Sequence, residues 1–162
     1  MGELALVIPF PGLPDVVEDW LERTVATKPS HGMPPHVTVL YPSPGDVVGI
    51  AEALLDFSAF DVDFRRLDRF PGILWLAPEP SAPFRELTNA LVARFPGYPP
   101  YGGKFADVIP HLTVAQAEQL NDAEAAVTDW LPLRTRAESV VLLEHVQSEH
   151  WREVATFDLE DS

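Results

Sequence analysis

The spacing of apolar residues divides the chain into short strands and amphipathic helices. Period-two alternation and short β-branched runs predict strands, whereas apolar positions three and four residues apart predict helices. The expected strands cover 3–10, 36–41, 60–67, 72–77, 110–114, 139–146 and 151–159. The expected helices cover 15–28, 46–55, 81–95 and 121–131.

Polar residues at helix starts and one parity change sharpen these expectations. Asp15 and Asp46 are suited to cap the first two helices, and Asn121 with Glu124 forms a capping-box pattern for the fourth. The second helix should bury the stripe Val47, Ile50, Leu54 and Leu55. In 60–67 the alternation changes parity before Leu67, which predicts a β-bulge near Arg65 and Arg66.

Two strands carry the same five-residue pattern. Pro35-His36-Val37-Thr38-Val39 is matched by Pro110-His111-Leu112-Thr113-Val114. Because side chains alternate along a strand, each copy should present a histidine and a threonine on one face and anchor the opposite face by apolar packing. Each copy is therefore a half-site, with an imidazole beside a hydroxyl.

The surroundings of the two patterns repeat as well. Strand, helix, strand, strand is the expected order after each one, and this predicts two related α+β lobes. The expected fold is α+β, with two pseudo-symmetric lobes of antiparallel strands and flanking helices. A rough two-fold axis between the lobes would bring both histidine–threonine faces to one central cleft.

Composition narrows the class of protein. With 162 residues and 46% hydrophobic content, residues 1–162 are expected to form a single bilobal domain with a real core. No apolar run is as long as the ~20 residues of a membrane-spanning helix, and the acidic start does not resemble a signal peptide. The chain has no cysteine, so it has no thiolate nucleophile or thiolate metal site. We expect a monomeric cytoplasmic protein.

The net charge of −14 disfavours tight, nonspecific binding to long nucleic acid, which requires many cationic contacts to phosphates. A small phosphorylated ligand remains compatible, because a cleft can be locally positive in an acidic protein.

Paired His-x-Thr-x strands in a small two-lobed chain resemble the 2H phosphoesterase superfamily, in the branch called 2′-5′ RNA ligase-like proteins. The resemblance rests on His36-Val37-Thr38-Val39 and His111-Leu112-Thr113-Val114, and the closing strands also look like that family's C-terminal pair. It implies a metal-independent phosphodiesterase acting on 2′,3′-cyclic phosphates or 2′-5′-linked nucleotides, without a cofactor. A nucleotide or short RNA end is the implied substrate, and ligation is the reverse of the same chemistry.

The chemistry accounts for the residue types. Imidazole can act as acid or base near neutral pH, and threonine hydroxyls can hydrogen-bond the non-bridging phosphate oxygens. The resemblance therefore implies catalytic roles for His36, Thr38, His111 and Thr113. Which histidine is the base depends on the orientation of the ligand. For opening a cyclic phosphate we favour His36 as acid and His111 as base.

Three further residues are candidate substrate-binding groups. Tyr101 and Lys104, just upstream of the second pattern, could reach a phosphate or stack on a base, but a plain loop role is equally open. Trp75 could stack on a base, although a core role is the more common one for tryptophan. His31, His145 and His150 are interpreted as surface or loop residues. Two interpretations are open for Arg65, Arg66 and Arg69: they contact a phosphate of the ligand, or they are solvated side chains on an edge strand.

Two other classes of function stay open. One is a module that binds a nucleotide or phosphorylated ligand without turnover. The other is a structural or interaction protein in which the repeated pattern is incidental. The position of His36 relative to His111 tests the structural alternative, because catalysis at one phosphate requires the two imidazoles on a common face. The binding module keeps the same cleft, and turnover that depends on both histidines would exclude it.

Overall fold

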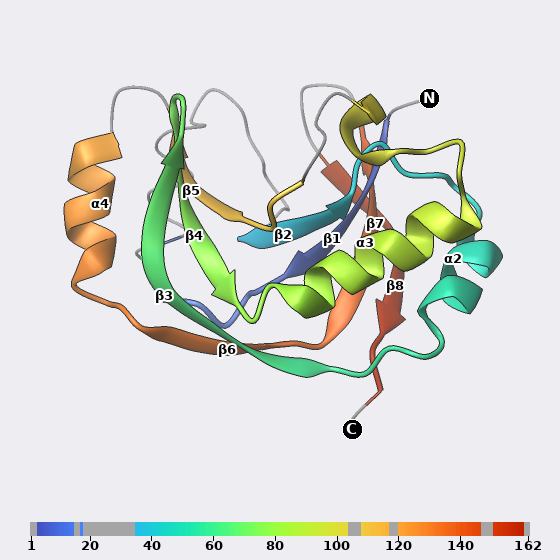
Figure 1. The fold of residues 1–162 in the computed structure, drawn as a ribbon, viewed down its shortest axis with the longest axis horizontal. Coiled ribbons are helices and arrows are strands. Elements are labelled where there is room, and N and C mark those ends of the chain that lie inside the picture. Colours follow the sequence, from blue (N-terminus) through green and yellow to red (C-terminus); the bar gives the residue numbers. More distant parts are fainter. Residues whose placement is uncertain are drawn as a thin grey trace.

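The computed structural model of the chain describes residues 3–14, 17, 35–103, 108–116, 120–146 and 151–160. The strands are β1 (Leu4–Pro9), β2 (His36–Leu40), β3 (Phe60–Phe70), β4 (Ile73–Glu79), β5 (Leu112–Gln116), β6 (Leu133–Ala137), β7 (Ser139–His145) and β8 (Trp151–Asp158). The helices are α2 (Val47–Leu54), α3 (Ala82–Arg94), α4 (Leu120–Thr128) and a 3₁₀ segment, η1 (Pro100–Gly103). The described strands form one curled antiparallel sheet (Figure 1).

The sheet consists of two four-stranded halves that meet between β5 and β2. Its strand order is β6-β3-β4-β5-β2-β1-β7-β8, so each half contributes one histidine–threonine strand to the centre. This confirms the predicted α+β fold with antiparallel halves. The halves are not consecutive in sequence, however. The β3–β4 hairpin that follows β2 pairs with β5, and the β7–β8 hairpin that follows β5 pairs with β1.

One face of the sheet is the main core. Val37 and Leu112 are fully buried there with Phe84 and Leu87 of α3, which lies across this face beside α2 (Figure 1). The Thr88 hydroxyl of α3 donates to the carbonyl oxygen of Val39 at 2.7 Å and so ties the helix to β2. The apolar residues of the repeated pattern are therefore the anchors of the two central strands.

The predicted Asp46 cap and the parity change in β3 are confirmed. Asp46 accepts a hydrogen bond from the Gly49 backbone N–H at 3.0 Å and caps α2. The β3–β4 register shifts between Phe64 and Leu67, which is the expected bulge. Helix α3 occupies the predicted 81–95 segment, with Ser81 and Phe95 as its caps.

The apolar stripe predicted for α2 is only partly right. Ile50 and Leu54 are buried, but Val47 and Leu55 are 40% and 72% exposed. Helix α2 packs against α3 through a narrow face, and the two outer positions of the stripe point to solvent.

Two expectations near the second pattern are wrong. Asn121 does not cap α4 but lies within it, and the Arg69 guanidinium donates to Asn121 Oδ1 at 2.9 Å and to Glu124 Oε1 at 3.2 Å. The segment 133–137, for which the pattern predicts no strand, forms β6 and pairs with β3 from Phe60↔Ala137 to Phe64↔Leu133. The layout from β5 onward is therefore strand, helix and three strands, with β5 as the first strand.

Several predictions fall on parts of the chain outside the described residues. These are the helix expected at 15–28, of which only Val17 is described, the turn around His31, and the residues Lys104 and His150.

Candidate active site

The histidines and threonines of the repeated pattern share one face of the sheet. Val37 and Leu112 are antiparallel register partners across the β2–β5 junction, and both are fully buried on the core face. Their neighbours on either side therefore project to the opposite face. The burial pattern agrees, because His36, Thr38, His111 and Thr113 are all partly exposed.

Continued by one residue in each direction, this antiparallel register sets His36 opposite Thr113 and Thr38 opposite His111. The four side chains then occupy the corners of a quadrilateral, with the histidines on one diagonal and the threonines on the other. Diagonal neighbours on one sheet face have Cβ atoms about 7–8 Å apart or somewhat less. A group the size of a phosphate can lie between two imidazoles at that spacing and contact both threonines.

His111 packs against two aromatic side chains. Its ring stands edge-on to Phe70, with centroids 5.1 Å apart, and to Trp75 at 5.9 Å. Burial lowers the pKa of His111 below its ordinary value of 6.5, and this effect outweighs the hydrogen bond to the Ile109 backbone, which raises the pKa. His111 is therefore favoured in its neutral form near pH 7.

The tautomer of that neutral form is set by a backbone contact. His111 Nδ1 lies 2.7 Å from the carbonyl oxygen of Ile109, and a carbonyl can only accept. The proton of a neutral ring therefore belongs on Nδ1, and Nε2 carries the lone pair. An imidazole held in this way is ready to take a proton at Nε2.

Trp75 supports His111 from the neighbouring strand. It pairs with Thr113 across β4 and β5, is 3% exposed, and stacks on Phe70 with centroids 4.8 Å apart. No described residue accepts a hydrogen bond from its buried Nε1. Trp75 thus exposes no ring face on which a nucleobase could stack, and it packs against His111 instead.

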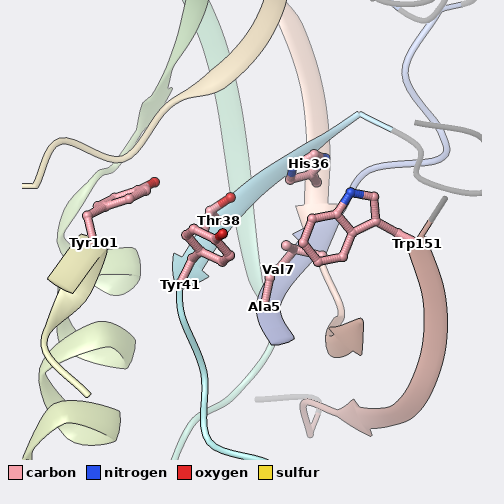
Figure 2. A pocket seen from close by; sticks show the side chains of 7 residues that line it. All are labelled: Ala5, Val7, His36, Thr38, Tyr41, Tyr101 and Trp151. Atoms are coloured by element: carbon pink, nitrogen blue, oxygen red, sulfur yellow. The ribbon is translucent and has the colours of Figure 1, made fainter. Parts of the chain in front are cut away.

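On the same face of the sheet, a cavity of about 250 Å³ opens beside His36, over β1 and β2 (Figure 2). His36 and Thr38 line its floor, and two small side chains of β1 leave it room. Its lining residues are Ala5, Val7, His36, Thr38, Tyr41, Tyr101 and Trp151. The site is therefore asymmetric, because His36 borders an open aromatic cavity whereas His111 borders a packed aromatic wall.

Tyr101 reaches into this cavity from η1. Its backbone N–H donates to the carbonyl oxygen of Tyr41 at 2.6 Å, and its side chain hydrogen-bonds that of Thr38. Burial raises the pKa of Tyr101 above 10.0, against a smaller lowering by the Thr38 contact. The phenol therefore stays protonated at neutral pH. This places the predicted binding residue Tyr101 beside Thr38.

The cavity contains two aromatic residues that the sequence analysis missed as site residues. Tyr41 and Trp151 meet edge-to-face with centroids 6.4 Å apart. The Tyr41 hydroxyl donates to Glu3 Oε1 at 2.6 Å, which helps to raise the pKa of Tyr41 to about 12. Tyr41 directly follows the first motif strand, and this adjacency was an available signal. Trp151 starts β8, and only the strand order β2-β1-β7-β8 brings it near.

The other charged candidates are used elsewhere. Arg65 pairs with Asp63 at 2.9 Å, and Arg66 with Asp68 at 3.0 Å, all on the surface. The third arginine, Arg69, contacts α4 as described above. His145 packs its ring against Trp151, with centroids 5.0 Å apart. Of the two interpretations of the arginines, the structure favours solvated surface groups.

Within the described ranges, no three His, Cys, Asp or Glu side chains gather in a way that could hold a metal ion. In the same ranges, no helix is both long and apolar enough to cross a bilayer.

Comparison with known proteins places this chain in a family. A family model described as the 2′-5′ RNA ligase superfamily matches residues 13–149, which is most of the chain. The chain belongs to the 2′-5′ RNA ligase superfamily. This confirms the resemblance found from the two His-x-Thr-x patterns. No curated protein sequence matches the chain.

Solved structures show the fold of this superfamily member in distant relatives. A phosphoesterase crystal structure aligns with a TM-score of 0.62 at 15% identity, covering 99% of this chain and 100% of the other. E. coli LigT complexed with 3′-AMP aligns with a TM-score of 0.62 at 13% identity, covering 98% of each chain. The protein TT0787 of Thermus thermophilus aligns with a TM-score of 0.61 at 18% identity, covering 99% of each. At these identities the likeness shows the fold alone.

Proposed function

We propose that the chain is a metal-independent phosphodiesterase that opens 2′,3′-cyclic phosphates, or cleaves 2′-5′ linkages, at a nucleotide or short RNA end. One observation supports this proposal, the pairing of Val37 with Leu112 on the core face. In an antiparallel pair this implies a common opposite face for His36 and His111, on one diagonal, and for Thr38 and Thr113, on the other. In-line displacement at phosphorus needs a base and an acid on opposite sides and donors to the non-bridging oxygens. The four side chains supply all of these, within one bilobal domain spanning 1–162.

In this proposal His111 is the general base and His36 the general acid. Neutral His111, protonated on Nδ1, uses Nε2 to take a proton from the attacking water. His36 gives a proton to the departing ribose oxygen. Thr38 and Thr113 donate to the non-bridging oxygens, where negative charge develops. The lowered pKa of His111 and its Ile109 contact support this direction of proton transfer.

The aromatic cavity suggests where the nucleoside lies. When a cyclic phosphate opens, the leaving oxygen stays on the nucleoside, so the nucleoside belongs on the side of the acid, His36. Tyr41 and Trp151 line the cavity on that side and can pack against a base. The His111 side is narrowed by Phe70 and Trp75, which favours water as the attacking group there. E. coli LigT has been crystallised with 3′-AMP and with NADP+, so a nucleotide is a reasonable ligand here too.

The test is an assay of 2′,3′-cyclic nucleotides and 2′-5′-linked dinucleotides in the presence of EDTA. We expect turnover by the unmodified protein and a loss of at least about a hundredfold in both His36→Ala and His111→Ala. Arg66→Ala, which removes a surface side chain paired with Asp68 and away from the cavity lining, is the control and should retain activity. Full activity in either motif variant would disprove the proposal.

A second candidate function is nucleotide or phospholigand binding without turnover. It is favoured by the net charge of −14 and by a cavity whose described lining contains neither lysine nor arginine. In that case a nucleoside monophosphate should raise the melting temperature while no product accumulates over hours. Turnover that depends on both histidines would rule this alternative out.

A further inference from the structure

Tyr101 has a backbone conformation that its residue type disfavours. Its φ is 51° and its ψ 35°, in the left-handed region, and among the described non-glycine residues it is the one with a positive φ. Gly102 and Gly103 follow it, so residues that adopt this region freely stand next to it in sequence. A bulky side chain held in this region is strained, and such strain gathers at functional sites.

With this backbone conformation, the phenol ring of Tyr101 points into the cavity. The hydrogen bond from the Tyr101 N–H to the Tyr41 carbonyl holds η1 against the end of β2. From there the ring enters the cavity and its hydroxyl group lies toward Thr38 (Figure 2). The ring is also 6.2 Å from that of Tyr41, centroid to centroid. The loop thus delivers a third hydroxyl group to the place where the first half-site presents Thr38.

We propose that the Tyr101 hydroxyl is a catalytic group that donates a hydrogen bond to a non-bridging phosphate oxygen together with Thr38. This deepens the proposed function and rests on it. Both hydroxyl groups can donate as well as accept, and each rotates about its C–O bond. When a phosphate oxygen enters beside Thr38, both can therefore turn a proton toward it.

The described lining of the cavity near Thr38 supplies hydroxyl groups and an imidazole as hydrogen-bond donors. Tyr101 adds a phenol hydroxyl to this set, close to where charge would develop on the phosphate oxygens. Because burial keeps the Tyr101 phenol protonated, it can donate throughout the neutral range. A donor fixed in advance near the developing charge lowers the barrier without reorganisation.

The experiment compares Tyr101→Phe with the unmodified protein on a 2′,3′-cyclic nucleotide. The phenylalanine keeps the ring and removes the donor. We expect kcat/KM to fall about tenfold to a hundredfold, as for loss of one hydrogen bond to a charged group. Tyr101→Asn, whose residue type tolerates positive φ, should show a loss at least as large.

Tyr98→Phe is the matched control, because Tyr98 precedes the same loop, is 40% exposed and does not line the cavity. It should keep the unmodified kcat/KM. A Tyr101→Phe variant as active as Tyr98→Phe would overturn the proposal while leaving the proposed function intact. If the unmodified protein has no turnover, the proposed function fails, and affinity for a nucleoside 2′-monophosphate then decides. Weaker binding by Tyr101→Phe would support the donor role, whereas equal binding, or none by either protein, would overturn it.

Discussion

Val37 and Leu112 face each other across the junction of the two halves of the sheet, and both are fully buried. This pairing determines the face on which the histidines and threonines lie, as well as the packing of the core. Shifting one strand by a single residue would turn its histidine and threonine into the core and its apolar residues outward. The hydrophobic anchors of the two central strands therefore determine that the two imidazoles share a face.

The pH dependence of activity should reflect the burial of His111. A general base must be neutral, and burial lowers the pKa of His111 below 6.5, so kcat/KM should fall only at pH values below 6.5 on the acidic side. Phe70→Ala exposes the His111 ring to water, so the pKa of His111 should rise and the acidic limb of the pH profile should move to higher pH. Phe57→Ala, which removes a ring that packs on the main core instead, should leave the limb in place. An acidic limb unmoved by Phe70→Ala would contradict burial as the cause.

Stability at Trp75 should depend on the ring more than on its N–H. Trp75→Ala removes a 3% exposed side chain and should cost about 3–5 kcal/mol of unfolding free energy. Trp75→Phe keeps an aromatic wall and removes a buried Nε1 that no described residue accepts, so it should cost less than about 1.5 kcal/mol. Urea unfolding measures both. Equal costs would show that the indole N–H has a partner in solution.

The N-terminus of α2 should depend on the Asp46 carboxylate. Asp46→Ala removes the acceptor for the Gly49 N–H and should lower the free energy of unfolding by about 1 kcal/mol. Asp46→Asn retains a capping oxygen and should lie close to the unmodified protein. Two variants with the same stability would argue against the cap.

Gly49 is expected to resist a substitution that usually strengthens helices. A Cβ at this position would lie 2.6 Å from Asp46 Oδ2 and 2.8 Å from Phe95 Cζ. Gly49→Ala should therefore destabilise, although alanine has a helix propensity about 1 kcal/mol better than glycine. Gly97→Ala, with nothing within 4 Å of the new Cβ, is the matched control and should be nearly neutral. A stabilised Gly49→Ala would show that α2 and α3 are less tightly packed there.

The features that could be predicted from the sequence are those that depend on nearby residues: which face a strand residue occupies, where a bulge lies and where a helix begins. The alternation in His36–Val39 and His111–Val114 named the four facing residues, the parity change before Leu67 located a bulge, and Asp46 marked a helix start. These signals lie within a few residues of the structure they specify. The resemblance to the family likewise came from the sequence, through the repeated pattern, the two-lobed layout and the closing pair of strands.

What escaped prediction depends on which segments meet in space. Strand β6 is a short edge strand with polar Arg134 and Arg136, and its pairing with β3 lies outside any local window. Asn121 matches a capping box in sequence, but its amide oxygen accepts from Arg69 instead. Trp151 enters the site only through the order of four strands. The contents of the cavity could not be deduced before that order was known.

The most direct measurement for the account is a crystal structure with a nucleoside 2′-monophosphate bound. We predict that the phosphate lies on the diagonal, with the Nε2 atoms of His36 and His111 on opposite sides and each about 2.7–3.2 Å from a phosphate oxygen. The base should lie in the cavity beside Tyr41 and Trp151. A phosphate held by only one of the two imidazoles, or bound away from this face, would contradict the two half-sites acting on one phosphorus.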